Sequence, residues 1–376
     1  MENEKSLHFV MRTPVNDDRP IYITGNFNQW NPRDENFRMQ QKEDGSYELY
    51  LTNFAIPQDL EYKYTKGGWE NVEIDRYGNI HGNRKLNTNQ IAETHDVVEL
   101  FRQNWAPYKK EFFPIVELIS DNFEIPQLDK TRRVWALLPH NYYNETKSYP
   151  VLYLQDAQNL FAEGSEFGNW EIDKKLSILA EYGRGDVIII AIEHGGEDRI
   201  KEYLFESNPL VHQGDGKKYI RFVTDTLKPF IDNKYRTLKS REHTGIGGSS
   251  LGGLISIYGG FLYPEVYSKL MIFSPSLWAV PKINFPMIKF YNPFEIKIYL
   301  YGGEKEGSQM VKRIYRFRDK MEKYDNDKEK DFVFKVSINP DGKHDEYYWS
   351  QEFPKAMEWL FYDTLEDPAQ KLLSEK

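Results

Sequence analysis

The sequence predicts an α/β protein, in which a mainly parallel sheet flanked by helices is preceded by a small antiparallel β-sandwich. Up to about residue 101, short runs of alternating polar and apolar residues are separated by turn residues, as in sandwich strands. From about residue 131, compact apolar runs alternate with amphipathic helical patterns, which is typical of a parallel sheet. A chain of 376 residues is long enough for two domains, so we place a sandwich at 1–103, a linker and leading arm at 104–125, and the α/β domain at 126–376.

The strands of the predicted sandwich are short runs bounded by turn residues. Polar and apolar residues alternate within each run, so that one face of a strand is buried and the other meets solvent. Glycine pairs and Asp-Gly steps beside the runs are turn signals. The runs lie at residues 20–24, 46–51 and 60–65.

The strands of the predicted parallel sheet are richer in Val, Ile and Leu, because a strand covered on both faces needs apolar residues at nearly every position. Between them, apolar residues three and four apart predict amphipathic helices, most clearly at 217–233 and 353–361. The apolar runs lie at residues 133–139, 150–154, 186–193 and 269–273.

Composition excludes several classes of function. The formal net charge is −9, whereas nucleic acids and anionic membranes require a basic face. The absence of cysteine excludes disulfides, thiolate metal sites and a cysteine nucleophile. The first residues do not have the pattern of a signal peptide, and no run approaches the ~18 apolar residues of a membrane span, so we expect a cytoplasmic protein with no membrane partner.

Residues 247–253, Gly-Gly-Ser-Ser-Leu-Gly-Gly, contain a candidate nucleophile. A serine at the tip of a sharp strand-to-helix turn needs very small residues two positions before and two after it. Ser250 has glycine at both positions, whereas Ser249 has leucine two positions after it. A phosphate-binding loop would instead need a lysine after its last glycine or a place at the first strand of the sheet, and this stretch has neither.

A serine nucleophile needs a base, and His344 is the only histidine that follows Ser250 in the chain. In strand-turn-helix serine enzymes the order is serine, acid, histidine, with the histidine on a loop after the last strand. The acid should follow the preceding strand, at 295–301, where the turn contains both Glu304 and Glu306. Either glutamate could orient His344, and the residue types alone do not decide which of them is the acid.

These motifs resemble those of the esterase D-like α/β-hydrolases, which include enterochelin, feruloyl and acetyl xylan esterases and the mycolyltransferases. The resemblance implies an α/β-hydrolase fold from about residue 116 to 361. It also favours Glu306, since in many relatives the acid follows a strand ending Gly-x-Lys-Glu. The matched stretches are 153–161, 191–203, 246–253, 274–278 and 342–344.

With this fold, the oxyanion of the reaction would be held by the backbone N–H groups of Leu251 and Ala157. The relatives' usual Asp-Gly-Gln is Asp156-Ala157-Gln158 here, so this loop departs from the family pattern. Tryptophan rings near the site are candidates for the substrate pocket walls. The residues assigned to the pocket are Asp156, Gln158, Trp170, Trp278 and Trp349.

The first part of the chain resembles the β-sandwich modules that bind starch and glycogen, through the stretches 25–30, 62–64, 68–69 and 83–84. In those modules two exposed indoles stack on sugar rings, and a lysine and an asparagine bond to hydroxyls. The resemblance implies sugar contacts by Trp30, Lys63, Trp69 and Asn83. Related sandwiches also serve as structural caps, and this alternative stays open.

The sequence therefore predicts a serine carboxylic-ester hydrolase with a Ser-His-Glu triad and an acyl-enzyme. We expect its partner to be a small-molecule or carbohydrate ester, either carbohydrate-linked or of an aromatic, siderophore-like acid, and we expect neither cofactor nor metal. One alternative is an acyltransferase that uses the same triad. The other is a non-catalytic glycan-binding protein that retains the hydrolase fold as a scaffold.

Overall fold

The structure, a computed structural model, describes residues 6–15, 17–52, 56–80, 82–104, 106–205, 213–280, 295–324 and 332–362. The chain divides into two compact units, the first within Met1–Lys109 and the second within Lys110–Asp363. Each unit has its own hydrophobic core. No helix in the described ranges is long and apolar enough to cross a membrane.

The first unit consists of short strands in small sheets. A four-stranded sheet has the order β3-β4-β1-β8, a three-stranded sheet the order β2-β5-β7, and β6 pairs with β9. The strands are β1 (Leu7–Arg12), β2 (Tyr22–Gly25), β3 (Gln40–Gln41), β4 (Tyr47–Leu51), β5 (Asp59–Thr65), β6 (Glu73–Ile74), β7 (Arg84–Asn87), β8 (Glu93–Val97) and β9 (Leu100–Phe101). Two one-turn helices, η1 (Glu35–Phe37) and η2 (Trp69–Asn71), lie between them.

Alternate residues along the strands of the first unit form its hydrophobic core. In β1, Leu7, Phe9 and Met11 are buried while the residues between them are half-buried. Among the described residues of this unit, the strand pairs are antiparallel except β1 with β8, which run parallel. The predicted antiparallel sandwich is thus present, with one parallel pair that alternation alone does not predict.

The second unit is built on one mixed eight-stranded sheet, with strand order β10-β11-β13-β12-β14-β15-β16-β17. The pairs β10–β11 and β11–β13 are antiparallel, and every pair from β13 to β17 is parallel. The strands are β10 (Ile115–Ile125), β11 (Lys130–Leu138), β12 (Val151–Gln155), β13 (Ile188–Ile192), β14 (Thr244–Ser249), β15 (Lys269–Phe273), β16 (Ile296–Gly303) and β17 (Phe332–Asn339). The carboxyl ends of the parallel strands therefore meet at one edge of the sheet.

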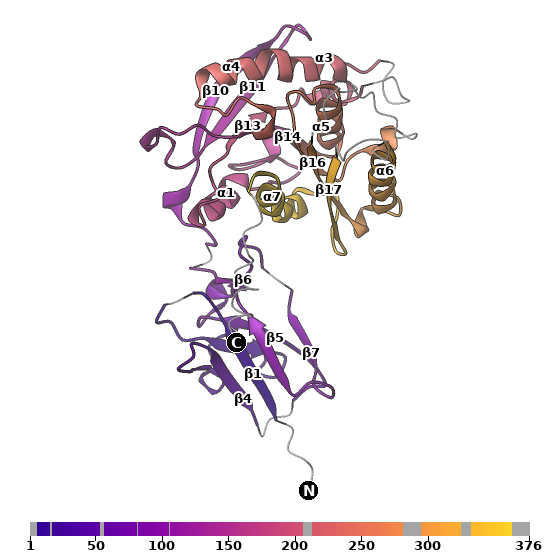
Figure 1. Ribbon diagram of the computed structural model, residues 1–376. Helices are drawn as coiled ribbons and strands as arrows, with labels where there is room; N and C mark the ends of the chain where they lie inside the picture. Colours follow the sequence, from indigo (N-terminus) through magenta and orange to yellow (C-terminus); the bar gives the residue numbers. More distant parts are fainter. Residues whose placement is uncertain are drawn as a thin grey trace. The chain divides into compact units, whose positions relative to one another are not determined.

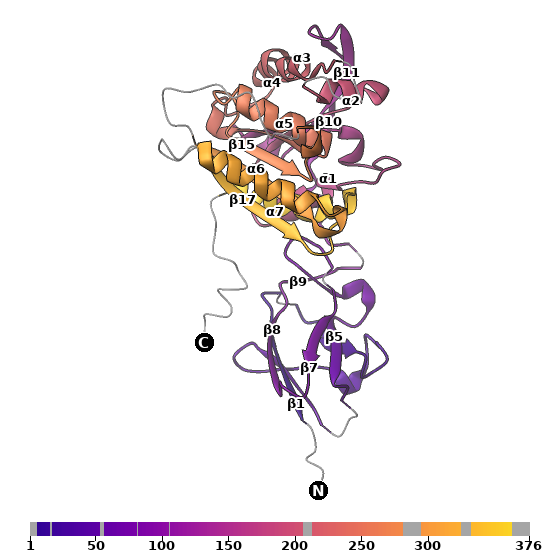
Figure 2. The ribbon, with the colours of Figure 1, turned by 90° about the vertical axis from the view of Figure 1, so that its right-hand side faces the viewer.

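Helices cover both faces of this sheet (Figure 1, Figure 2). On β14, Gly245 faces Phe361 of α7 while Ile246 faces Gly259 of α5, so α7 and α5 lie on opposite faces. Helix α1 packs against α7. The helices are α1 (Ile172–Glu181), α2 (Arg199–Tyr203), α3 (Gly216–Arg221), α4 (Lys228–Lys234), α5 (Leu251–Leu262), α6 (Met310–Tyr324) and α7 (Glu346–Phe361).

The structure differs from expectation in two elements. The segment expected as linker and leading arm contains β10, because Ile115–Ile125 forms a hairpin with β11 and half-buries alternate side chains on the sheet edge. The helix expected at 217–233 consists of α3, a π-helical turn η7 (Phe222–Leu227) and α4. Pro229 lacks the N–H that would bond to the carbonyl of Asp225, so the α-helical hydrogen-bond ladder is interrupted there.

Candidate active site

Ser250 lies at the tip of a sharp turn between β14 and α5. Its backbone has φ 54° and ψ −121°, a strained conformation that a non-glycine residue rarely adopts. A Cβ on Gly248 would lie 2.9 Å from the carbonyl carbon of Gly252, and a Cβ on Gly252 would lie 2.8 Å from Asp156 Oδ2. The turn therefore needs glycine on both sides of Ser250, as predicted, whereas Ser249 is the buried last residue of β14.

The turn is held against the segment that follows β15. The Ser250 N–H donates to the carbonyl of Phe273 (2.9 Å), and the Ser276 N–H donates to the carbonyl of Ser250 (3.0 Å). The two hydroxyl groups, Ser250 Oγ and Ser276 Oγ, lie 3.2 Å apart. Two backbone bonds thus fix where the Ser250 hydroxyl is presented.

His344 is paired with a buried glutamate at the same sheet edge. His344 Nδ1 lies 2.7 Å from Glu306 Oε2, and the Glu306 side chain is fully buried whereas that of His344 is 41% exposed. Glu304, in the same turn, is exposed. Of the two glutamates between which the residue types could not decide, Glu306 is the one that contacts His344.

The chemistry of the partners fixes the tautomer of His344. An ionised carboxylate only accepts hydrogen bonds, so His344 Nδ1 carries the proton that is donated to Glu306. His344 Nε2 is then the unprotonated nitrogen, which can act as a base. Among the hydrogen bonds of the described residues, none joins His344 to Ser250; such bonds often tighten only when substrate is bound.

The glutamate and histidine loops meet because two glycines are in contact. A Cβ on Gly303 would lie 2.1 Å from the carbonyl oxygen of Gly342, so neither strand end could approach as closely with a side chain there. The Lys305 N–H also donates to the carbonyl of Gly342 (3.0 Å). Directly after His344, Asp345 caps α7 by accepting the N–H of Tyr348.

Both predicted oxyanion donors lie at the first position of a helix. Leu251 begins α5, and Ala157 begins a one-turn helix η5 (Ala157–Asn159) that follows β12. The first N–H groups of a helix have no partner within it and are available to an anion. Asp156, which precedes Ala157, has a left-handed backbone with φ 64°.

The side chains of Asp156 and Gln158 are engaged by the loop that follows β13. Arg199 donates to both carboxylate oxygens of Asp156, at 2.7 and 2.8 Å. Gln158 exchanges two hydrogen bonds with the backbone of His194, at 3.1 and 3.0 Å. These two predicted pocket residues therefore hold the Ala157 loop in place from within the protein.

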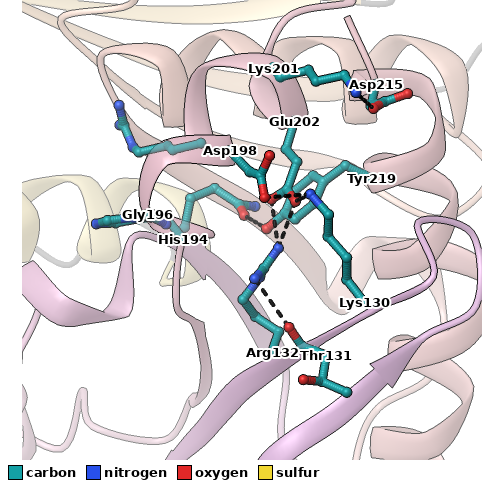
Figure 3. Close-up of polar contacts among 12 residues, drawn as sticks. Lys130, Thr131, Arg132, His194, Gly196, Asp198, Lys201, Glu202, Asp215 and Tyr219 are labelled. Atoms are coloured by element: carbon teal, nitrogen blue, oxygen red, sulfur yellow. Dashed lines mark hydrogen bonds and ion pairs between the residues drawn. The ribbon is translucent and has the colours of Figure 1, made fainter.

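The loop after β13 is itself anchored by a buried ion pair (Figure 3). Glu202 is fully buried and accepts two bonds from Arg132 Nη2, at 2.8 and 2.7 Å, and one from Lys130 Nζ at 3.1 Å. Burial lowers the pKa of His194 below its ordinary value, and the Gly196 N–H donates to its Nδ1 (3.0 Å). The sequence motif 191–203 indicated this loop, but the residue types alone did not reveal its contacts.

The three tryptophans expected at the pocket differ in exposure. Trp170 and Trp349 are only 2% and 4% exposed, and their ring centroids lie 6.0 Å apart in the core. Trp278, two residues after Ser276, is 42% exposed. Of these three tryptophans, Trp278 alone is exposed.

In the first unit, the four predicted sugar contacts fall into two groups. Trp30 and Trp69 are half-buried, with ring centroids 6.3 Å apart and planes tilted by 39°. Lys63 is buried, and its Nζ donates to the carbonyl of Gly82 (3.2 Å). Asn83 is exposed and donates from Nδ2 to Glu61 Oε2 (2.9 Å). The two indoles form a half-buried pair, while Lys63 and Asn83 have partners within the protein.

Comparison with known proteins identifies a family and several relatives. Residues 125–360 match the profile of a family described as "Putative esterase". An uncharacterized protein of Bacillus subtilis, YbbA, is 26% identical over 241 residues, which cover 61% of this chain and 92% of that protein. An α-amylase of Niallia circulans is 37% identical over 93 residues, which cover 25% of this chain and 7% of the amylase.

Solved structures share the fold. The enterobactin esterase FES from Shigella flexneri, crystallised in the presence of enterobactin, aligns with a TM-score of 0.52 at 14% sequence identity. The alignment covers 95% of this chain and 92% of that one. At this identity the likeness concerns the fold alone.

Proposed function

The chain belongs to this esterase family and is a carboxylic ester hydrolase, and from this premise we propose that it cleaves its substrate through a Ser250–His344–Glu306 triad. The observation that carries the proposal is the 2.7 Å contact of the buried Glu306 with His344, at the sheet edge where the strained turn presents Ser250. The exposed Glu304 has no such contact with His344 among the described residues.

The reaction proceeds in two steps through an acyl-enzyme. His344 Nε2 takes the proton of Ser250 Oγ as this oxygen bonds to the ester carbonyl carbon. The C–O bond to the alcohol then breaks, and His344 returns the proton to the leaving alcohol. Water repeats the sequence, which releases the carboxylic acid and restores Ser250.

The negative charge of each tetrahedral intermediate is held by the N–H groups of Leu251 and Ala157. Removing one such donor typically lowers the rate by about 10² to 10³. The loop that carries Ala157 must therefore hold this N–H in a fixed position. The bonds of Asp156 with Arg199 and of Gln158 with His194 support this role, since they fix the loop before substrate arrives.

We propose that the substrate is an ester with a carbohydrate or an aromatic part. Trp278 supports this proposal because its exposed ring lies two residues from Ser276, whose hydroxyl is 3.2 Å from that of Ser250. In the first unit, the half-buried indole pair Trp30 and Trp69 suits a sugar ring, because indoles combine an apolar face with a polar N–H. One protein of similar fold is an enterobactin esterase.

The test is a panel of esters, from p-nitrophenyl acetate to acetylated and feruloylated sugars, hydrolysed by the full chain and by two serine variants. Ser250→Ala should lose at least about 10³-fold in kcat, because the nucleophile is removed. The matched control is Ser249→Ala, which removes the hydroxyl of the preceding, buried residue and should retain activity. Product analysis with an added oligosaccharide distinguishes hydrolysis from acyl transfer.

Two results would count against the triad. Ser250→Ala with nearly full activity would exclude Ser250 as nucleophile, and equal losses in Ser249→Ala and Ser250→Ala would mean that the turn, rather than the Ser250 hydroxyl, matters. Mass spectrometry of Ser250 after brief exposure to the ester gives an independent check, because an acyl group should be found on that residue.

A further inference from the structure

A serine and a tryptophan outside the proposed triad are bonded to its acid. Glu306 Oε1 accepts the N–H of Gly303 (2.6 Å) and the hydroxyl of Ser274 (2.7 Å). Ser274 Oγ in turn accepts the indole N–H of Trp349 (2.9 Å). Ser274 is fully buried and Trp349 is 4% exposed, so solvent does not compete for these bonds.

The direction of this chain of bonds follows from the chemistry of its members. An indole N–H can only donate, so Ser274 Oγ must accept from Trp349. The one hydroxyl proton of Ser274 is then directed at Glu306, which as a carboxylate only accepts. These bonds therefore bring a donor to Oε1 of Glu306, whereas His344 bonds to Oε2.

Trp349 also touches the base. The rings of Trp349 and His344 meet edge to face, with centroids 5.0 Å apart and planes at 83°. Trp349 in turn packs against Trp170, whose ring stacks on Phe273 with centroids 5.1 Å apart. One rigid side chain thus contacts the imidazole directly and the carboxylate through Ser274.

The backbone holds Ser274 in an unusual conformation to make these bonds. Ser274 directly follows β15, has φ 43°, and donates its N–H to the carbonyl of Tyr301 on β16 (2.8 Å). Strained backbone of this kind persists only where the surroundings enforce it, and it often marks a functional site. Here it directs the Ser274 hydroxyl at Glu306.

We infer that Ser274 and Trp349 are positioning residues, which hold the carboxylate of Glu306 and the ring of His344 in the arrangement that leaves His344 Nε2 free as base. This inference rests on the proposed function, since it assigns a role relative to the proposed acid and base. Ser274 spreads the charge of Glu306 over one more donor, and Trp349 keeps the imidazole from rotating. Both residues act through Glu306 and His344.

The test is Ser274→Ala, compared with Ser268→Ala. Ser268 directly precedes β15, is 5% exposed and donates to the carbonyl of Arg241 at 2.7 Å, so the control removes an equally short, buried serine bond at the opposite end of the same strand. Without the Ser274 hydroxyl, the negative charge on Glu306 is less dispersed. It therefore stabilises the protonated, imidazolium form of His344 more strongly, and this form persists to higher pH. The acid limb of the kcat/KM–pH profile should move up by about one pH unit, and kcat should fall about tenfold.

A second readout does not depend on turnover. The proton shared by His344 Nδ1 and Glu306 should give a low-field proton NMR resonance in the wild type and in Ser268→Ala. This resonance should shift further downfield in Ser274→Ala, because the less dispersed charge on Glu306 accepts the proton more strongly. If the acid limb and the resonance in Ser274→Ala match those of Ser268→Ala, even with lowered kcat, the inference is overturned. The esterase proposal would then stand, because it depends on Ser250→Ala and not on this resonance.

Trp349→Phe tests the same inference if Ser274→Ala fails to fold. Phenylalanine keeps an aromatic ring against His344 but lacks the N–H that polarises the Ser274 hydroxyl, so the acid limb should move in the same direction by a smaller amount. Trp359→Phe, ten residues further along α7, is the matched control. Equal pH profiles for the two tryptophan variants would contradict the role of Trp349.

Discussion

Glu304 and Glu306 occupy one short turn but have opposite environments. Glu306 is directed inward, where the Gly303 N–H, the Ser274 hydroxyl and His344 converge on its carboxylate. Glu304 meets solvent. The buried charge of Glu306 is therefore fully hydrogen-bonded, which is the condition under which a buried carboxylate is tolerated.

Replacing each glutamate by glutamine tests which of the two is needed for catalysis. Glu306→Gln should lower kcat by about 10³ to 10⁴, because an amide can donate to His344 Nδ1 and so favour the wrong tautomer. Glu304→Gln removes only a solvated charge and should change kcat less than about twofold. Steady-state hydrolysis of p-nitrophenyl acetate by both variants measures the difference. Equal, small effects would mean that neither glutamate is the acid.

Residue types predicted the tip of the turn better than its surroundings. Ser250 could be selected because steric rules require glycine on both sides, and His344 because no other histidine follows it. The choice between the glutamates depends on which way a turn faces, which residue types do not encode. The contacts of Ser274 and Trp349 join residues 75 positions apart, so only the folded chain reveals them.

At the scale of elements, the site depends on how closely β16 and the loop after β17 approach each other. Gly302 and Gly303 end β16, and Gly342 lies in the loop that leads to His344. Gly303 and Gly342 are in contact through their backbones, so Glu306 and His344 are brought together by the absence of side chains.

Gly303→Ala should therefore disrupt the site without changing a catalytic side chain. Its Cβ would lie 2.1 Å from the carbonyl oxygen of Gly342, and the two loops would have to separate. We expect a loss of about 1–3 kcal/mol in the free energy of unfolding and, since a misplacement of about 1 Å can cost about 10²-fold, a similar fall in kcat. Gly82→Ala, where nothing lies within 4 Å of the added Cβ, is the control.

Thermal unfolding and kcat, measured together, check this prediction. If Gly303→Ala and Gly82→Ala have the same kcat, the close approach is not needed to assemble the pair.

Local sequence patterns predicted some helices and strands of the second unit better than others. The buried strands of the parallel sheet were predicted closely, because their apolar runs are short, rich in Val and Ile and bounded by turn residues. Strand β10 was not, since its edge position leaves polar residues on it and the nearby Pro107, Pro114 and Pro126 resemble a linker. The π-helical turn at 222–227 follows from the hydrogen bond that Pro229 cannot make, a local signal that amphipathic periodicity hides.

At the scale of the whole molecule, the chain joins an esterase unit to a β-sandwich unit with its own core. The fold of both parts was predicted from the change of hydrophobic pattern near residue 101. A strand with alternating residues has one face buried, whereas a strand with a continuous apolar run has both faces buried. Whether the sandwich contributes to substrate choice depends on the accessible surface of two indoles, which composition does not determine.

The indole pair gives a prediction for the full chain. Trp69→Ala should leave hydrolysis of p-nitrophenyl acetate unchanged, because the small ester needs only the second unit. The same variant should lower kcat/KM on an acetylated or feruloylated polysaccharide about tenfold, since sugar binding by the sandwich would raise the effective concentration of ester. The control is Tyr50→Ala, which removes a 57% exposed aromatic ring elsewhere in the first unit and should behave as the wild type on both substrates. Equal rates of the two variants on the polysaccharide would assign the sandwich to a structural role, whereas a selective loss in Trp69→Ala would make it part of substrate recognition.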